Sequence, residues 1–110
     1  MIIPLPDEAG LGAVLEAPAA VIYKHSPRCG ACIASAQELA FFADGHPEVP
    51  VYQIDVVARP QLARTVADRL GVLHESPQAI LVADGRAVWS ASHWDVRALD
   101  LEEQLARLPI

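Results

Sequence analysis

The chain has 110 residues, 53% of them apolar and 20% charged, a composition that supports one packed domain over residues 1–110 and excludes a disordered chain. The formal net charge is −6 and the eight Lys and Arg residues form no run, which excludes the clustered positive charge of a nucleic-acid-binding surface. The start has no basic head followed by a long apolar run, and no apolar stretch is long enough to span a bilayer. We therefore expect a soluble cytoplasmic protein that binds neither nucleic acid nor membrane.

Short apolar runs alternate with helical patterns in the first half of the chain. A short helix is expected from about Asp7 until Pro18 ends it, and the continuous apolar run 19–23 is typical of a strand covered on both faces. Residues 24–28 predict a polar loop. Apolar side chains at three- and four-residue steps then predict a helix from Cys29 to Gly45.

The alternation continues in the second half. Residues 51–56 predict a strand, and Pro60 begins a helix that Gly71 ends. The runs 79–83 and 86–91 flank Asp84-Gly85, a strong β-hairpin signal, and a last helix is expected over about 97–108. After the first helix this order is that of the thioredoxin fold. We expect an α/β domain with a central four-stranded mixed sheet, helices on both faces and an extra N-terminal helix.

Cys29 and Cys32 form a C-x-x-C motif where the loop after a strand meets the start of a helix. Unpaired N–H groups and the helix dipole favour a thiolate there, and the thiolate is the nucleophile. His25 and Arg28 are close enough in sequence to add positive potential. Cys32, one turn further on, can reach the Cys29 sulfur and resolve a mixed disulfide. The motif therefore predicts a thiol–disulfide oxidoreductase in which Cys29 attacks.

Two other uses of the cysteines are open. A C-x-x-C pair is half of a typical zinc site, but the chain has no second pair and only His25 nearby, so no metal is expected. The cysteines can also be an inert buried pair, although the polar loop with Ser26 and Pro27 argues against this.

Ser76-Pro77 immediately precedes the predicted strand at 78–83. Thioredoxin-like proteins have a cis proline at this place, and its loop faces the active cysteine and offers backbone groups to an extended thiol substrate. X–Pro is the linkage at which a cis peptide is inexpensive. Ser76 and Pro77 are therefore candidate substrate-binding residues, with an ordinary turn proline as the alternative.

Three segments resemble a known family: IYKHS at 22–26, HESPQA at 74–79 and AVWSASHW at 87–94. They are similar to the YtxJ group of bacillithiol-system proteins, the monothiol bacilliredoxins, from about residue 20 to the C-terminus. The resemblance implies a thioredoxin fold and the removal of bacillithiol, a low-molecular-weight thiol, from mixed disulfides on proteins. Bacillithiol would be a co-substrate, and no bound cofactor is expected.

The chain departs from this family pattern at one position of the motif. The family usually has serine where Cys32 stands, so a one-cysteine and a two-cysteine route are both open. Tyr23, six residues before Cys29, occupies the place at which ordinary thioredoxins have a buried carboxylate.

Ser92, His93 and Trp94 follow the final predicted strand. In the related glutaredoxins this corner lies beside the proline loop and binds the carboxylate end of glutathione. Ser92 and His93 are therefore candidate donors to an acidic thiol, with Trp94 as an apolar wall. The alternative is a capping turn in which Trp94 covers the core.

Three functions follow from these observations. The first is reduction of mixed disulfides between proteins and bacillithiol, which the Ser92–Trp94 corner favours because a general reductase needs no small-thiol pocket. The second is a general protein-disulfide reductase supplied by a flavin-dependent disulfide reductase. The third is a binding module whose cysteines form a redox-sensitive latch or zinc ligands shared between subunits. We expect a monomer.

Overall fold

The computed structural model describes residues 1–27 and 29–109. Its centre is a five-stranded sheet in the order β1-β3-β2-β4-β5. The strands are β1 (Ile2–Pro4), β2 (Ala19–His25), β3 (Val51–Asp55), β4 (Gln78–Ala83) and β5 (Arg86–Ser92). The first three strands run parallel, and β4 and β5 pair antiparallel, so the sheet is mixed. The predicted thioredoxin-like α/β class is confirmed.

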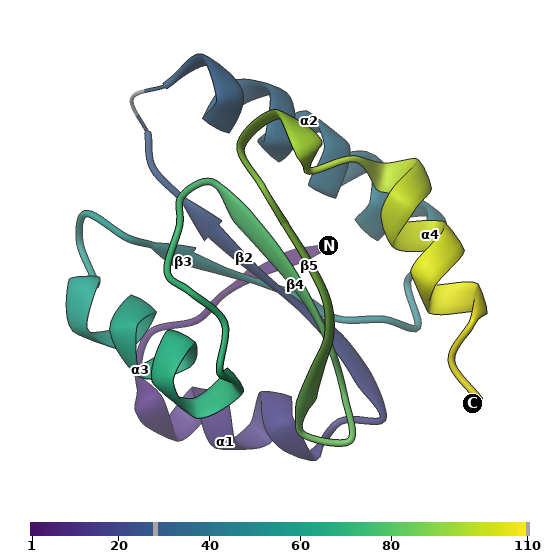
Figure 1. The fold of residues 1–110 in the computed structure, drawn as a ribbon, viewed down its shortest axis with the longest axis horizontal. Helices are drawn as coiled ribbons and strands as arrows, with labels where there is room; N and C mark the ends of the chain where they lie inside the picture. Colours follow the sequence, from purple (N-terminus) through teal and green to yellow (C-terminus); the bar gives the residue numbers. More distant parts are fainter. Residues whose placement is uncertain (28, 110) are drawn as a thin grey trace.

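Helices cover both faces of the sheet (Figure 1). The helices are α1 (Glu8–Glu16), α2 (Gly30–Gly45), α3 (Pro60–Leu70) and α4 (Ala98–Ala106), and the 3₁₀ helix η1 (His93–Asp95) joins β5 to α4. α1 and α3 lie on one face, and α2 and α4 lie on the other (Figure 1). Local sequence sets the ends: the Asp7 side chain accepts the Gly10 N–H, and α3 begins with a proline and stops at Gly71, whose φ is 66°.

Two apolar cores follow from this arrangement. Alternate side chains of the central strands β2 and β4 point to opposite faces, so both strands are buried on both sides. One core, which includes Val21, Leu39, Phe42 and Leu101, lies under α2 and α4. The other includes Leu11, Ile22, Ile54, Val66 and Ile80 and lies under α1 and α3. No helix in the described ranges has the length and apolar character needed to cross a membrane.

The sheet has one strand more than the four predicted. Ile2–Pro4 pairs parallel with β3, with Ile2 opposite Val51. A three-residue strand is too short to show a period, and its proline is tolerated because β1 is an edge strand. Only its partner, some fifty positions along the chain, makes this segment a strand.

The predicted polar loop at 24–28 begins later than expected. β2 continues to His25, and Lys24 is fully buried within it. Lys24 lies opposite Gln78 of β4 and Ile54 of β3 in the register of the sheet. In a sequence, a charged side chain after an apolar run indicates that the strand has ended. Here the strand continues because a residue far along the chain contacts the buried charged group.

Candidate active site

The two cysteines lie at the start of α2, just after the end of β2. Cys29 is the N-cap residue, and its sulfur accepts the Cys32 N–H at 3.1 Å. Cys29 and Cys32 form a disulfide with their Cα atoms 5.1 Å apart. Cys29 is half-buried, whereas Cys32 is 1% exposed. A substrate can therefore reach Cys29, and the N–H directed at its sulfur favours the thiolate once the disulfide is reduced. The neighbouring candidate Arg28 lies outside the described residues.

A buried hydrogen-bonded cluster lies behind the cysteines. The Tyr23 hydroxyl is 2.6 Å from Ser35 Oγ and 2.9 Å from His25 Nδ1, and it donates to the Cys32 carbonyl at 3.3 Å. Ser35 Oγ donates to the same carbonyl at 3.1 Å. Burial raises the pKa of Tyr23, and the hydrogen bond between its hydroxyl and Ser35 opposes that rise. The candidate residue His25 is thus tied to the helix that carries Cys32.

The proline loop has the cis conformation expected by analogy with thioredoxin-like proteins, and not that of an ordinary turn proline. The Ser76–Pro77 peptide is cis, and the Pro77 carbonyl accepts the His93 N–H at 2.8 Å. Ser76 Oγ is buried and finds no hydrogen-bond partner in the part of the chain that the structure describes. The loop is therefore joined through its backbone to the corner at residues 92–94.

Glu75 occupies that corner. Its carboxylate accepts the Ser92 hydroxyl at 2.9 Å and lies 3.1 Å from His93 Nε2. The hydrogen bonds from Ser92 and then His93 lower the pKa of Glu75. The two side chains predicted to hold an acidic thiol thus already bind a carboxylate of the protein. No local pattern in the sequence indicates this role for Glu75, although the residue lies within the HESPQA segment that carries the resemblance.

Trp94 lies beside the cysteine motif rather than over the core. It is 64% exposed, and a Cβ placed on Gly30 would be 3.7 Å from its Cη2 atom. Trp94 also lines a shallow groove of about 330 Å³ together with Gln37 and Arg97. The Pro77–His93 hydrogen bond thus joins the proline loop to the 92–94 corner, and Trp94 of that corner lies beside Gly30, the residue after Cys29.

Lys24 is a second feature that sequence analysis missed. Its side chain is fully buried, and Nζ lies 3.0 Å from His74 Nδ1. Burial lowers the pKa of Lys24 from 10.5 to about 8. Burial, and then the charges of Lys24 and Arg64, lower the pKa of His74, while Glu75 acts in the opposite direction. In the sequence, the only indication of this buried contact is the position of the lysine directly after an apolar run.

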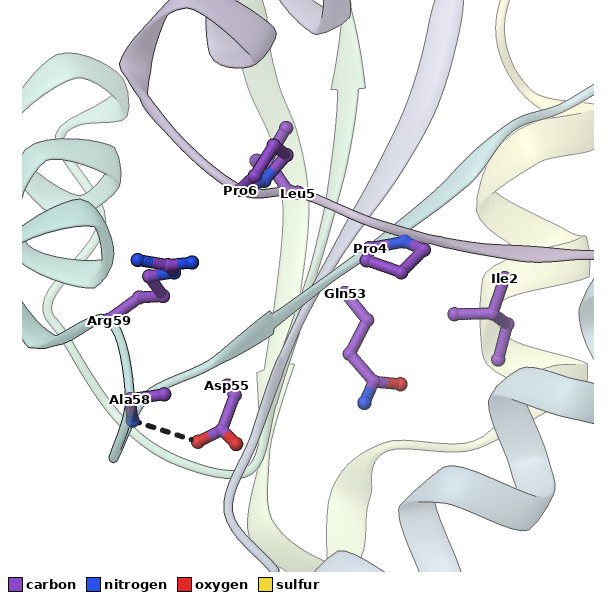
Figure 2. Close-up of a pocket in the computed structure, with 8 residues that line it drawn as sticks. All are labelled: Ile2, Pro4, Leu5, Pro6, Gln53, Asp55, Ala58 and Arg59. Carbon is purple, nitrogen blue, oxygen red and sulfur yellow. Dashed lines mark hydrogen bonds between the residues drawn. The ribbon is translucent and has the colours of Figure 1, made fainter.

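A larger hollow of about 470 Å³ lies along the β1 edge of the sheet. Figure 2 shows its polar side chains, Gln53, Asp55 and Arg59, and the hydrogen bond from the Ala58 N–H to Asp55. No cysteine or histidine lines it, so thiol chemistry belongs to the surface around Cys29. Within residues 1–27 and 29–109, no group of three or more His, Cys, Asp or Glu side chains is placed to hold a metal ion.

The family model described as monothiol bacilliredoxin BrxC matches residues 4–101. The chain belongs to the monothiol bacilliredoxin family. The resemblance carried by the IYKHS, HESPQA and SHW segments is thereby confirmed at the level of the family. The match does not bear on the fourth motif position, where this chain has Cys32 disulfide-bonded to Cys29.

Solved structures similar to this chain share its fold. One, described as a candidate oxidoreductase with a thioredoxin fold, is 25% identical with a TM-score of 0.88, covering 94% of this chain and 93% of its own. Mitochondrial thioredoxin 3 from Saccharomyces cerevisiae, in its oxidised form, is 19% identical with a TM-score of 0.79, covering 97% and 95%. Fasciola hepatica thioredoxin is 22% identical with a TM-score of 0.72, covering 96% and 97%. Family, fold and disulfide together support a thiol–disulfide oxidoreductase.

Proposed function

We propose that this bacilliredoxin reduces mixed disulfides between proteins and bacillithiol, with Cys29 as the attacking and Cys32 as the resolving thiol. The observation that carries the proposal is the cysteine pair itself. An accessible sulfur caps a helix N-terminus, and a buried sulfur one turn away is bonded to it, in a chain of the monothiol bacilliredoxin family.

The reaction proceeds in two exchanges. The Cys29 thiolate attacks the bacillithiol sulfur, a Cys29–bacillithiol disulfide forms, and the substrate protein leaves as a thiolate that takes up a proton. The Cys32 thiol then loses its proton and attacks the Cys29 sulfur, which releases bacillithiol as a thiolate. Two electrons pass from the cysteine pair to the mixed disulfide, and the product is the Cys29–Cys32 disulfide seen in the structure. A flavin-dependent disulfide reductase in the cytoplasm would return the two electrons.

The surface around Cys29 supplies the contacts for a small thiol. The cis Ser76–Pro77 loop would meet the extended part of the adduct through the backbone of the half-buried Ser76, because the Pro77 carbonyl already accepts the His93 N–H. Trp94, adjacent to Gly30, offers an exposed flat face beside the cysteine motif. Ser92 and His93 can donate to an anionic group of the thiol once their hydrogen bonds to Glu75 break.

General protein-disulfide reduction is the second candidate, and the closed Cys29–Cys32 disulfide favours it. A protein disulfide has two protein thiols as leaving groups and makes no use of a small-thiol corner. After the first exchange the substrate protein is disulfide-bonded to Cys29, and its release depends on Cys32. A small thiol bound to Cys29 can also be removed by a second molecule of free thiol.

The two candidates are separated by turnover of three substrates. Wild type, Cys29→Ser and Cys32→Ser are assayed on a protein–bacillithiol mixed disulfide, the matching glutathione adduct and insulin. The proposal predicts fastest cleavage of the bacillithiol adduct, no activity in Cys29→Ser and substantial activity in Cys32→Ser when free bacillithiol is present. Reduction of insulin alone, lost in both variants, would identify a general reductase. Unchanged redox behaviour in both variants would argue against both enzymatic functions and leave the binding module as the remaining function.

A further inference from the structure

The loops around the cysteine pair leave the sheet at one end of three adjacent strands. Lys24 near the end of β2 is the register partner of Gln78 at the start of β4, and Gln78 is the register partner of Ser92 at the end of β5. Neighbouring strands in a sheet are about 4.8 Å apart. The cysteine loop after β2, the proline loop before β4 and the corner after β5 are therefore neighbours, with the proline loop in the middle.

Glu75 brings a carboxylate from the proline loop to the corner. Its Oε1 atom accepts the Ser92 hydroxyl at 2.9 Å, and its Oε2 atom lies 3.1 Å from His93 Nε2. Trp94, the next residue of the corner, lies beside Gly30 of the cysteine motif. The Glu75 side chain is 41% exposed. A molecule bound at this end of the sheet can therefore reach the carboxylate from the solvent side.

This carboxylate can accept further hydrogen bonds. Its two oxygens offer about four lone-pair sites, and the described residues use one site on each oxygen. The hydrogen bonds from Ser92 and His93 lower the pKa of Glu75, so the group is ionised at neutral pH. The remaining sites accept hydrogen-bond donors only, and a positively charged donor binds a carboxylate more strongly than a neutral one.

An anionic group and a cationic group of a thiol meet different conditions at this corner. An anionic group has to break both hydrogen bonds to Glu75, and it then lies close to the displaced carboxylate, which stays attached to the neighbouring loop. Like charges at such short range repel. An ammonium group needs no rearrangement, because the carboxylate can accept it while Ser92 and His93 remain bound. The folded corner therefore favours a cation.

We propose that Glu75 determines the specificity of this surface by pairing with a protonated amine of the small thiol bound to Cys29. The ligand class is a low-molecular-weight thiol that carries a primary ammonium group. Glu75 contacts this thiol away from its sulfur, so it is a binding residue and takes no part in the exchange itself. The inference rests on the proposed function only in placing a small thiol on Cys29.

Exchange with symmetric disulfides of different charge tests this pairing without bacillithiol. The disulfides are cystamine, which is a dication, hydroxyethyl disulfide, which is neutral, and dithiodiglycolate, which is a dianion. In Cys32→Ser the Cys29 thiolate attacks one sulfur, the new disulfide forms as the old S–S bond breaks, and one small thiol leaves as a thiolate that takes up a proton. Intact-protein mass spectrometry gives the rate constants for Cys32→Ser alone and combined with Glu75→Gln. Glu103→Gln on α4, where Glu103 pairs with Arg107, changes the net charge equally and is the matched control.

Each rate constant is divided by that for the neutral disulfide, so that general changes in the reactivity of Cys29 cancel. Glu75→Gln should lower the cystamine ratio by about 2- to 5-fold, the size of one exposed ion pair, and raise the dithiodiglycolate ratio. Glu103→Gln should change neither ratio. An unchanged cystamine ratio in Glu75→Gln, a fall in both ratios, or an equal effect of Glu103→Gln would overturn the pairing. Failure of wild type to cleave bacillithiol adducts, with the ratios behaving as expected, would instead overturn the proposed substrate and leave the pairing standing.

Discussion

The buried lysine makes stability depend on pH in a calculable way. Lys24 is the only lysine in the chain, it is fully buried, and its Nζ lies 3.0 Å from His74 Nδ1. Its pKa is lowered from 10.5 to about 8, because burial disfavours the ammonium form. Replacing it by methionine, Lys24→Met, keeps most of the side-chain volume and removes the titrating group.

The magnitude follows from the two pKa values. Between pH 8 and 10.5 the unfolded chain holds a proton that the folded chain has released, so the stability of wild type rises with pH across this window. At about 1.36 kcal/mol per pKa unit, the gain is about 3 kcal/mol between pH 7 and 10.5. Lys24→Met lacks this gain, whereas tyrosine and carboxyl titrations are common to both proteins and cancel.

Urea unfolding of the oxidised proteins measures this difference. Both cysteines stay in the disulfide, so no thiol titrates, and unfolding free energies are compared at intervals from pH 7 to 10.5. The wild-type value minus the Lys24→Met value should rise by about 3 kcal/mol, and the single lysine Nζ resonance should titrate near the lowered pKa. A difference that stays constant over this range would refute the burial argument.

Three further outcomes follow from the site and the core. Trp94→Ala should raise the KM for the bacillithiol adduct several-fold and leave insulin reduction unchanged, since the indole is exposed beside Gly30; equal effects on both substrates would contradict a small-thiol contact. Ser92→Ala should move the pKa of Glu75 back up toward its ordinary value in a carboxyl NMR titration, because the hydrogen bond from the Ser92 hydroxyl is the main cause of the lowered pKa. In wild type this hydrogen bond to the carboxylate is lost only as the pH falls through the lowered pKa of Glu75. Leu101→Ala should destabilise the fold by about 2–5 kcal/mol in urea unfolding with an unchanged m-value, because its side chain on α4 is fully buried in the core that α2 and α4 cover. A loss below about 1 kcal/mol would contradict the tight packing of this core.

Local patterns predicted most of the fold. The apolar run at 19–23, the three- and four-residue steps after Cys29 and the Asp84-Gly85 turn each determine an element with little help from distant residues, and each element is present. β1 escaped prediction because a three-residue strand is defined by its partner β3 rather than by a period of its own. The order of these helices and strands along the chain was then enough to predict the fold class.

Long-range partners explain what the sequence did not reveal about the site. The cysteine motif is a local feature and was predicted, whereas the cis form of the Ser76–Pro77 peptide was one of two alternatives that the sequence left open. The pair Lys24–His74 joins residues 50 positions apart, and the bond from Ser92 to Glu75 joins residues 17 apart, so neither contact has a signature in one segment. The one sequence feature that pointed to such contacts was a polar residue next to an apolar run, as at Lys24.

The central claim is that Cys29 receives bacillithiol from a protein and Cys32 removes it. Intact-protein mass spectrometry after a single turnover tests this most directly, with reduced wild type or Cys32→Ser mixed with a protein–bacillithiol disulfide in the absence of free thiol. Cys32→Ser should gain the mass of one bacillithiol at Cys29, whereas wild type should gain no adduct and lose two hydrogens as the Cys29–Cys32 disulfide forms. An unmodified Cys32→Ser protein, with the substrate protein still carrying its bacillithiol, would contradict the account.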